Sequence, residues 1–145
     1  MRFLIQRVKK AKVQVENKTI STTNQGLVVL IGIENNDTKE KANYLINKLI
    51  NLRIFPDDNK KMNLSIKDID GELMLISQFT LYADCTNGNR PSFTKAGNPE
   101  YANELYQYII SECESKVRIV KTGIFGADMQ ISLINDGPVT IMLER

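Results

Sequence analysis

Three segments of this 145-residue chain hold side chains that could bind or hydrolyse a substrate. The first is Ser77-Gln78-Phe79-Thr80-Leu81, in which two hydroxyl groups flank an amide and an aromatic ring. A hydroxyl becomes a nucleophile when a neighbouring base accepts its proton. Asp84 and Glu72 are possible bases, but no spacing selects either of them, and hydroxyl side chains at strand ends also satisfy local backbone groups. Because no base is selected, the residues alone favour the structural interpretation and leave the catalytic one open.

The second segment is Asn135-Asp136-Gly137-Pro138-Val139-Thr140. Asp-Gly is a common turn pair, and a following proline interrupts strand pairing, so spacing alone favours a turn between two strands. An X-Pro bond is also the one place where a cis peptide is inexpensive. A Gly-cis-Pro unit would present its backbone carbonyls in an orientation that no side chain can reproduce.

The third segment is the loop Gly88-Asn89-Arg90-Pro91-Ser92-Phe93. The guanidinium of Arg90 could hold a phosphate while the ring of Phe93 stacks on a base, as in RNA-binding loops. The same residues also suit an ordered surface turn. A net charge of +2 permits nucleic-acid binding without requiring it.

The chain contains no histidine, which is its most informative absence. Histidine is the commonest general base at neutral pH and a frequent zinc ligand, so a serine-histidine triad is excluded. The chain has no nucleotide-binding glycine motif and no acidic cluster with metal spacing, and neither a metal nor another cofactor is implied. Of the two cysteines, Cys113 falls on the inward face of a predicted helix and Cys85 falls in a polar loop.

Hydrophobic periodicity indicates which elements must position these segments. Apolar residues recur at helical spacing over 38–51, after a capping-box pattern at Asp37-Thr38-Lys39-Glu40. They recur again after Asn98, where Pro99 would occupy the first helical position. Alternating or continuously apolar runs predict strands at 2–9, 12–16, 26–33, 72–81, 116–121, 129–133 and 139–143. The last two strands would flank the second segment in a hairpin-like arrangement.

No repeat or linker divides the chain, so residues 1–145 are expected to form one domain. The predicted class is α+β: a strand-rich domain with mixed or antiparallel sheets forming a barrel-like core and two main helices packed on them. No apolar run is long enough to span a membrane or to serve as a signal peptide, so we expect a cytoplasmic location.

Two of the segments together resemble one enzyme family. Ser77–Leu81 is similar to the signature pentapeptide of the D-aminoacyl-tRNA deacylases, formerly D-tyrosyl-tRNA deacylases. Asn135–Thr140 is similar to that family's second motif, an Asn, a variable residue and then Gly-Pro-Val-Thr. The resemblance covers essentially the whole chain and includes Gln6-Arg7-Val8 and Phe125-Gly126-Ala127-Asp128-Met129. It implies hydrolysis of the ester bond of D-aminoacyl-tRNA, a translation quality-control reaction known as chiral proofreading.

The resemblance also implies roles for particular residues. The catalytic segment would comprise Ser77, Gln78, Phe79 and Thr80. The pocket for the aminoacylated 3′-terminal adenosine of tRNA would include Met129, Thr140, Arg90 and Phe93. Gly137 and Pro138, joined by a cis bond and braced by Arg7, would form a chirality filter that reaches into the partner's pocket in a homodimer.

The missing histidine suits such a reaction, because an aminoacyl ester is already activated and carries a neighbouring 2′-hydroxyl. Backbone N–H groups at Phe79 and Thr80 could stabilise the oxyanion without a protein base. Since glycine has no side chain to clash, glycyl-tRNA mischarged on tRNA-Ala is an expected second substrate. Two alternatives stay open: an esterase with Thr80 as nucleophile, and a non-catalytic dimeric RNA-binding module.

Overall fold

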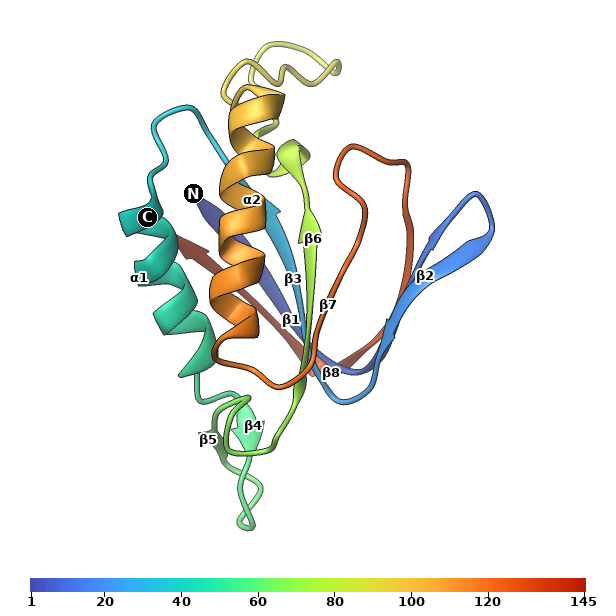
Figure 1. The fold of residues 1–145 in the computed structure, drawn as a ribbon, viewed down its shortest axis with the longest axis vertical. Helices are drawn as coiled ribbons and strands as arrows, with labels where there is room; N and C mark the ends of the chain where they lie inside the picture. The colour runs from blue at the N-terminus through green and yellow to red at the C-terminus, as the bar shows by residue number, and fades with distance from the viewer.

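The computed structural model describes residues 1–145 and consists of a six-stranded mixed sheet, a two-stranded sheet, two α-helices and a short 3-10 helix (Figure 1). The strands are β1 (Arg2–Val15), β2 (Lys18–Thr23), β3 (Gly26–Gly32), β4 (Phe55–Pro56), β5 (Met62–Leu64), β6 (Glu72–Ser77), β7 (Val120–Thr122) and β8 (Gln130–Glu144). The helices are α1 (Lys39–Ile50), η1 (Phe79–Tyr82, the 3-10 helix) and α2 (Pro99–Glu114).

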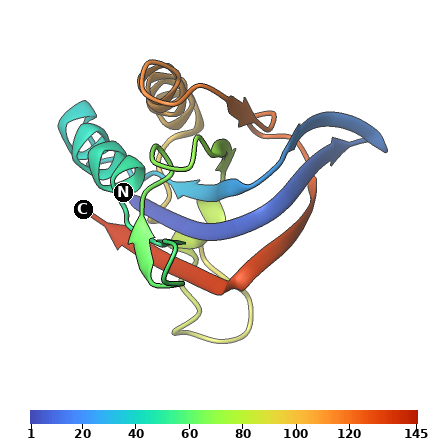
Figure 2. The same ribbon diagram turned by 90° about the horizontal axis from the view of Figure 1, so that it is seen from below.

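The large sheet runs in the order β2-β1-β3-β6-β7, and β8 pairs with β1 as well. Strand β1 is antiparallel to β2, β3 and β8, whereas β3, β6 and β7 are mutually parallel. The sheet curls strongly, as Figure 2 shows from below. The hydroxyl of Ser21 on β2 donates to the carbonyl of Thr122 on β7 at 2.8 Å, which nearly closes the curl. The predicted strand-rich α+β fold with a barrel-like core is therefore confirmed.

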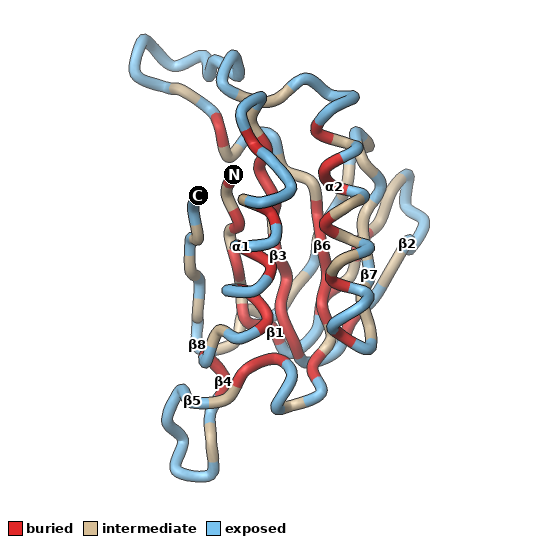
Figure 3. The backbone as a smooth tube through the Cα atoms, turned by 60° about the vertical axis from the view of Figure 1, so that its left-hand side comes forward, coloured by how far each residue is buried: buried red, intermediate tan, exposed pale blue.

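Both α-helices cover the same face of this sheet (Figures 1 and 2). Alternation along β1 turns Phe3 and Ile5 toward the helices, where they are completely buried. Figure 3 shows the buried residues concentrated along β1, β3 and β6 and on parts of the two helices. Cys113 on α2 lies in this core as predicted, and burial raises the pKa of its thiol to about 12, so it stays protonated. Neither helix is long and apolar enough to cross a membrane.

The helix starts agree with the sequence pattern in one case and differ in detail in the other. Asn98 caps α2 through its side chain, as expected. Helix α1 is capped by Thr38, whose hydroxyl accepts from the backbone N–H of Lys41. Asp37 does not cap the helix, because its buried carboxylate instead pairs with the ammonium of Met1 at 2.6 Å.

Several strand predictions were wrong in extent. The two predicted strands at the start of the chain form one strand, β1, while β2, β4 and β5 had no clear pattern in the sequence. The strand predicted for 72–81 ends at Ser77, because the chain turns there into the 3-10 helix η1.

The predicted C-terminal hairpin is a single strand, β8. Both of its halves pair with the same neighbour, β1, from Arg2↔Glu144 to Gln14↔Gln130. Two segments that bond one partner in the same direction cannot also fold back on each other. The Asp-Gly-Pro sequence therefore interrupts a strand instead of connecting two strands.

Candidate active site

The Ser77–Leu81 segment lies where β6 ends and η1 begins. The backbone N–H of Gln78 donates to the carbonyl of Ile31 at 2.7 Å, which holds the turn against the end of β3. Leu81 N–H then donates to the Gln78 carbonyl at 3.3 Å, so the helix follows at once. No side chain caps η1. The first N–H groups of such a helix have no partner within the helix and are free to bind a substrate oxygen.

A pocket of about 610 Å³ opens beside this turn, between η1, the start of α2 and the chain that leads into β8. Nine of its fifteen lining residues are hydrophobic. The lining consists of Ile31, Ile33, Ser77, Gln78, Phe79, Phe93, Ala96, Gly97, Pro99, Ala102, Phe125, Gly126, Ala127, Asp128 and Met129. A largely apolar pocket with few polar groups is typical of a small-molecule site.

Three aromatic rings, those of Phe79, Phe93 and Phe125, form part of this lining. Phe79, which is 57% exposed, meets Phe93 edge to face with 5.0 Å between the ring centroids. Phe125 lies 6.0 Å from the ring of Tyr106, whose hydroxyl donates to the carbonyl of Leu75 at 2.8 Å. Helix α2 therefore holds Phe125 in place through a side chain anchored on β6.

The hydroxyl of Thr80 has an amide as its neighbour. The side-chain amide of Gln78 donates to Thr80 Oγ1 at 2.5 Å. An amide N–H cannot accept a proton, so this contact does not activate the hydroxyl as a nucleophile.

The two acids that the sequence left as possible bases do not serve either hydroxyl. Glu72 lies at the opposite end of β6 from Ser77, about 16 Å away along the strand. Its carboxylate binds the backbone and side-chain amides of Asn24. Hydrogen bonds from Thr86, together with the ammonium of Lys95, lower the pKa of Asp84 to about 2, which makes it a weak base.

The Asp136–Val139 segment forms a bulge at the edge of the large sheet. Between the pairs Gln6↔Thr140 and Val8↔Asn135, β8 has three more residues than β1. Gly137 and Pro138 are exposed at this bulge, and the bond between them is cis, as the resemblance implied.

The side chain of Arg7 packs against the bulge and supports it. Its side chain is almost fully buried, and its Nη1 donates to the carbonyl of Ile54 at 2.5 Å. Its Nε lies 3.1 Å from a carboxylate oxygen of Asp136, an ion-pair distance, although the N–H does not point at that oxygen. A Cβ built on Gly137 would lie 3.0 Å from Arg7 Nη2. The guanidinium is thus packed directly against the glycine.

The structure separates the predicted site residues into two groups. Ser77, Gln78, Phe79, Phe93 and Met129 line the pocket, and Thr80 follows them on η1. The bulge residues, with Arg7 and Thr140, do not line it. Thr140 instead accepts a hydrogen bond from the side-chain amide of Asn135 at 3.0 Å. Arg90 is exposed on the loop that precedes Phe93, and it does not line the pocket either.

Other pocket residues were not predicted as site residues from the sequence. Phe125 and Asp128 belong to a stretch that was noted only as part of the family resemblance. Ile31 and Ile33 had the pattern of a buried strand, and no local signal distinguishes a strand residue that faces a pocket from one that faces the core.

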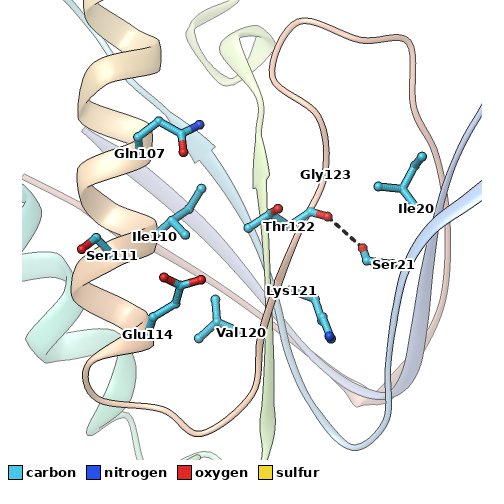
Figure 4. Close-up of a pocket in the computed structure, with 10 residues that line it drawn as sticks. All are labelled: Ile20, Ser21, Gln107, Ile110, Ser111, Glu114, Val120, Lys121, Thr122 and Gly123. Atoms are coloured by element: carbon cyan, nitrogen blue, oxygen red, sulfur yellow. Dashed lines mark hydrogen bonds between the residues drawn. The ribbon is translucent and has the colours of Figure 1, made fainter.

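A second cavity, of about 520 Å³, lies between α2, β7 and the edge of β2 (Figure 4). Its lining includes Gln107, Ser111 and Glu114 on α2 and Lys121 on β7. None of the sequence motifs contributes to it. No group of three or more acidic, cysteine or histidine side chains is placed to hold a metal ion anywhere in the chain.

Comparisons with known proteins show the family of the chain. A family model described as D-Tyr-tRNA(Tyr) deacylase matches residues 4–144. The chain is 54% identical over 144 residues to the D-aminoacyl-tRNA deacylase of Thermosipho africanus, covering 99% of this chain and 97% of the relative. It is 55% identical over 141 residues to that of Mannheimia succiniciproducens, covering 97% of each.

Two solved structures share the fold. One is named c-Myc DNA Unwinding Element Binding Protein, with a TM-score of 0.94, 37% identity and coverage of 100% of this chain and 99% of the other. The other is described as a probable eukaryotic D-amino acid tRNA deacylase, with a TM-score of 0.83 and coverage of 98% and 97%. At 17% identity, the second likeness concerns the fold alone. From the family match over nearly the whole chain and the relatives above 50% identity, the chain belongs to the D-aminoacyl-tRNA deacylase family.

Proposed function

We propose that this protein hydrolyses the ester bond of D-aminoacyl-tRNA and releases a free D-amino acid and tRNA. The observation that carries the proposal is the Ser77–Thr80 turn, which places uncapped backbone N–H groups beside an apolar pocket. Family membership supports the same activity. We place the reaction in the cytoplasm, where aminoacylated tRNA is used.

The pocket has a suitable size and lining for the aminoacylated 3′-terminal adenosine. Its volume of about 610 Å³ lies within the range of roughly 300–1,000 Å³ for small-molecule sites. Stacking of a base on an aromatic ring stabilises binding by about 1–3 kcal/mol. Phe93 and Phe125 are available for such stacking, and Met129 adds a flexible apolar surface beside them.

Catalysis would rely on the backbone and the substrate. The N–H groups of Phe79 and Thr80 would donate to the oxygen that becomes negative when water adds to the ester carbonyl. One donor of this kind is worth about 2.7–4 kcal/mol in other hydrolases. The 2′-hydroxyl of the terminal ribose would assist proton transfer, which removes the need for a protein base. Thr80 as a covalent nucleophile is the second candidate, disfavoured by its amide neighbour.

The chirality filter would come from a second copy of the chain. Arg7 pairs with Leu27 on β3, whereas the pocket begins at Ile31, four residues along that strand, or about 13 Å. The bulge lies farther still, because β8 is separated from β3 by β1. Gly137 and Pro138 are therefore too distant to act on an ester in their own pocket. A homodimer that inserts each bulge into the other copy's pocket would bring them together.

A surface for that second copy lies on the large sheet. Leu4 on β1 is directly opposite Leu30 on β3 and Met142 on β8, so these three side chains form one row on the face away from the helices. Leu4 and Leu30 are only half-buried, and Met142 is 43% exposed. A row of partly exposed apolar side chains is typical of an interface between protein chains.

Selectivity would follow from steric exclusion. A backbone wall at Gly137–Pro138 would reject any L side chain by collision, whichever residue it belongs to. The same wall would not detect the side chain of a D residue, so a broad range of D-amino acids would be accepted. Glycyl-tRNA would also enter, including glycine mischarged on tRNA-Ala.

The test is deacylation of D-Tyr-tRNA and L-Tyr-tRNA at equal concentration. We expect rapid release from the D substrate and almost none from the L substrate. Inertness toward both, with retained binding of tRNA, would instead support a non-catalytic nucleic-acid-binding module, the function suggested by the name of one solved structure. Equal turnover of small D-aminoacyl esters without RNA would support a simple esterase.

A further inference from the structure

The side chain of Arg2 connects the start of β1 with the end of the 3-10 helix η1. Its Nη1 donates to the carbonyl of Leu81 at 2.6 Å. Its guanidinium carbon lies 4.6 Å from the centre of the Tyr82 ring. Its Nε lies 2.6 Å from a carboxylate oxygen of Glu144 on β8. One side chain therefore joins two strands of the large sheet to η1, and the mechanism above gives it no role.

The register of the sheet determines where this guanidinium points. Arg2 is the partner of Glu144 on one side and of Gly32 on the other. A Cβ built on Gly32 would lie 3.0 Å from Leu81 Cβ and 3.2 Å from the Tyr82 ring, so the glycine lets η1 pack directly on β3. A guanidinium is planar, with its N–H groups in fixed directions. Because Glu144 holds Nε, Nη1 points at the Leu81 carbonyl.

This contact lies close to the backbone donors of Phe79 and Thr80. Leu81 follows Phe79 by two residues, which is about 4 Å along a 3-10 helix. Just before the helix, Gln78 is held by its backbone hydrogen bond to β3. The last carbonyl groups of a helix have no partner within the helix, and Arg2 supplies one for Leu81. The two bonds hold η1 at both of its ends.

We propose that Arg2 is a positioning residue, which fixes η1 so that the N–H groups of Phe79 and Thr80 face the reacting ester. The inference rests on the proposed function, which it deepens. Stabilisation of an oxyanion requires donors at about 2.7–3.1 Å from the oxygen in the transition state. A displacement of about 1 Å, caused by a change away from the chemistry, can lower a rate by about 100-fold. Since Arg2 does not line the pocket, we expect it to affect the rate and not substrate binding.

The test replaces Arg2 by methionine and measures deacylation of D-Tyr-tRNA under single-turnover conditions. Methionine keeps an unbranched stem, and its sulfur can pack on the Tyr82 ring, but it cannot donate to Leu81. We expect the maximal rate to fall by about 10–100-fold, while the enzyme concentration that gives half of this rate stays within about twofold of the wild-type value. Arg2→Lys, which keeps a donor on a flexible stem, should recover part of the lost rate.

Arg118→Met is the matched control. Arg118 forms an exposed ion pair with Asp70, also at 2.6 Å, next to the start of β6 and therefore at the opposite end of that strand from η1. Its replacement should leave the maximal rate and the half-saturating concentration unchanged. Because Arg2 lies two residues from Leu4 in the apolar row, light scattering should show the same oligomeric state for Arg2→Met and the wild-type protein.

Three results would overturn the inference while the proposed function stands. One is an unchanged maximal rate in folded Arg2→Met, because the contact with Leu81 would then not be needed to place η1. Another is a raised half-saturating concentration with an unchanged maximal rate, which would place the guanidinium against the tRNA itself. The third is an equal loss of rate in Arg118→Met, which would reflect a general loss of positive charge. If the wild-type protein did not hydrolyse D-Tyr-tRNA at all, the proposed function itself would fail, and the inference with it.

Discussion

Replacing Gly137 by alanine tests whether the bulge is a rigid wall. Gly137 has a φ of +115°, a region that L side chains rarely adopt. A Cβ at this position would lie 2.9 Å from Val139 Cγ2 and 3.0 Å from Arg7 Nη2. The backbone strain costs about 1–3 kcal/mol, and relieving such close contacts costs a further amount of about 1–3 kcal/mol. We expect Gly137→Ala to lower the free energy of unfolding by about 2–6 kcal/mol.

Gly88→Ala is the matched control for the strain. Gly88 also has a positive φ, +90°, but a Cβ there would meet nothing within 4 Å. The Gly88→Ala variant should therefore have the backbone strain without the close contacts. Its loss in free energy of unfolding should be smaller than that of Gly137→Ala by at least about 1 kcal/mol. Urea unfolding followed by circular dichroism measures both variants under the same conditions.

The same change should weaken chiral selection. Moving Val139 or Arg7 to make room for the methyl group displaces the peptide that excludes L side chains. A site that discriminates only by fit retains about 1–3 kcal/mol, or roughly 10–200-fold, between similar substrates. We expect the ratio of D-Tyr-tRNA to L-Tyr-tRNA deacylation by folded Gly137→Ala to fall into that range. A ratio equal to that of the wild-type protein, with a stability no lower than that of Gly88→Ala, would refute the rigid wall.

Four further predictions concern single residues. Thr80→Ala should keep single-turnover deacylation within about tenfold of the wild-type rate, because the hydroxyl has no base beside it and the backbone N–H is retained. Arg7→Ala should lower the free energy of unfolding in urea by about 2–4 kcal/mol, because a buried carbonyl and a partly buried carboxylate lose their cation. Leu4→Glu should convert a dimer into monomers in light scattering, because it places a charge in the apolar row. The stabilising contribution of Asp84, whose pKa falls from 3.8 to about 2 on folding, should be present above pH 4 and be lost as the pH falls toward 2. Acid unfolding of Asp84→Asn should lack that part of the pH dependence.

Each of these outcomes has a clear opposite. Complete loss of activity in a folded Thr80→Ala variant would favour the covalent nucleophile. Wild-type stability of Arg7→Ala would show that the guanidinium does not support the bulge. Ile20→Glu is the control for Leu4→Glu, since Ile20 is 41% exposed on β2 and lies outside the apolar row. Dissociation of the dimer by both variants would place the interface elsewhere. If the stability of Asp84→Asn fell with acid pH as steeply as that of the wild-type protein, the ionised Asp84 carboxylate would not contribute to stability.

Much of the fold could be predicted because the controlling interactions are local. The cap at Asn98 and the periodicity behind it located α2 correctly, since a helix satisfies its hydrogen bonds within a few residues. The continuous apolar run at 26–33 indicated a strand buried on both faces, which β3 is. The extent of β6 and β8 could not be predicted in this way, because the Gln78 turn and the Asp136 bulge are set by pairing with β3 and β1.

The same distinction between local pattern and tertiary structure applies to the candidate site. The sequence by itself determined the family, through two motifs, and it excluded histidine chemistry through composition. Only the tertiary structure decided that Thr80 faces an amide, that Asp128 is the single charge in the pocket, and that the Gly137–Pro138 bulge lies away from the pocket of its own chain. The physical reason is that motifs specify residue types and local backbone. Which side chains meet depends on the register of strands that are distant in the sequence, and that register is settled by burial over the whole sheet.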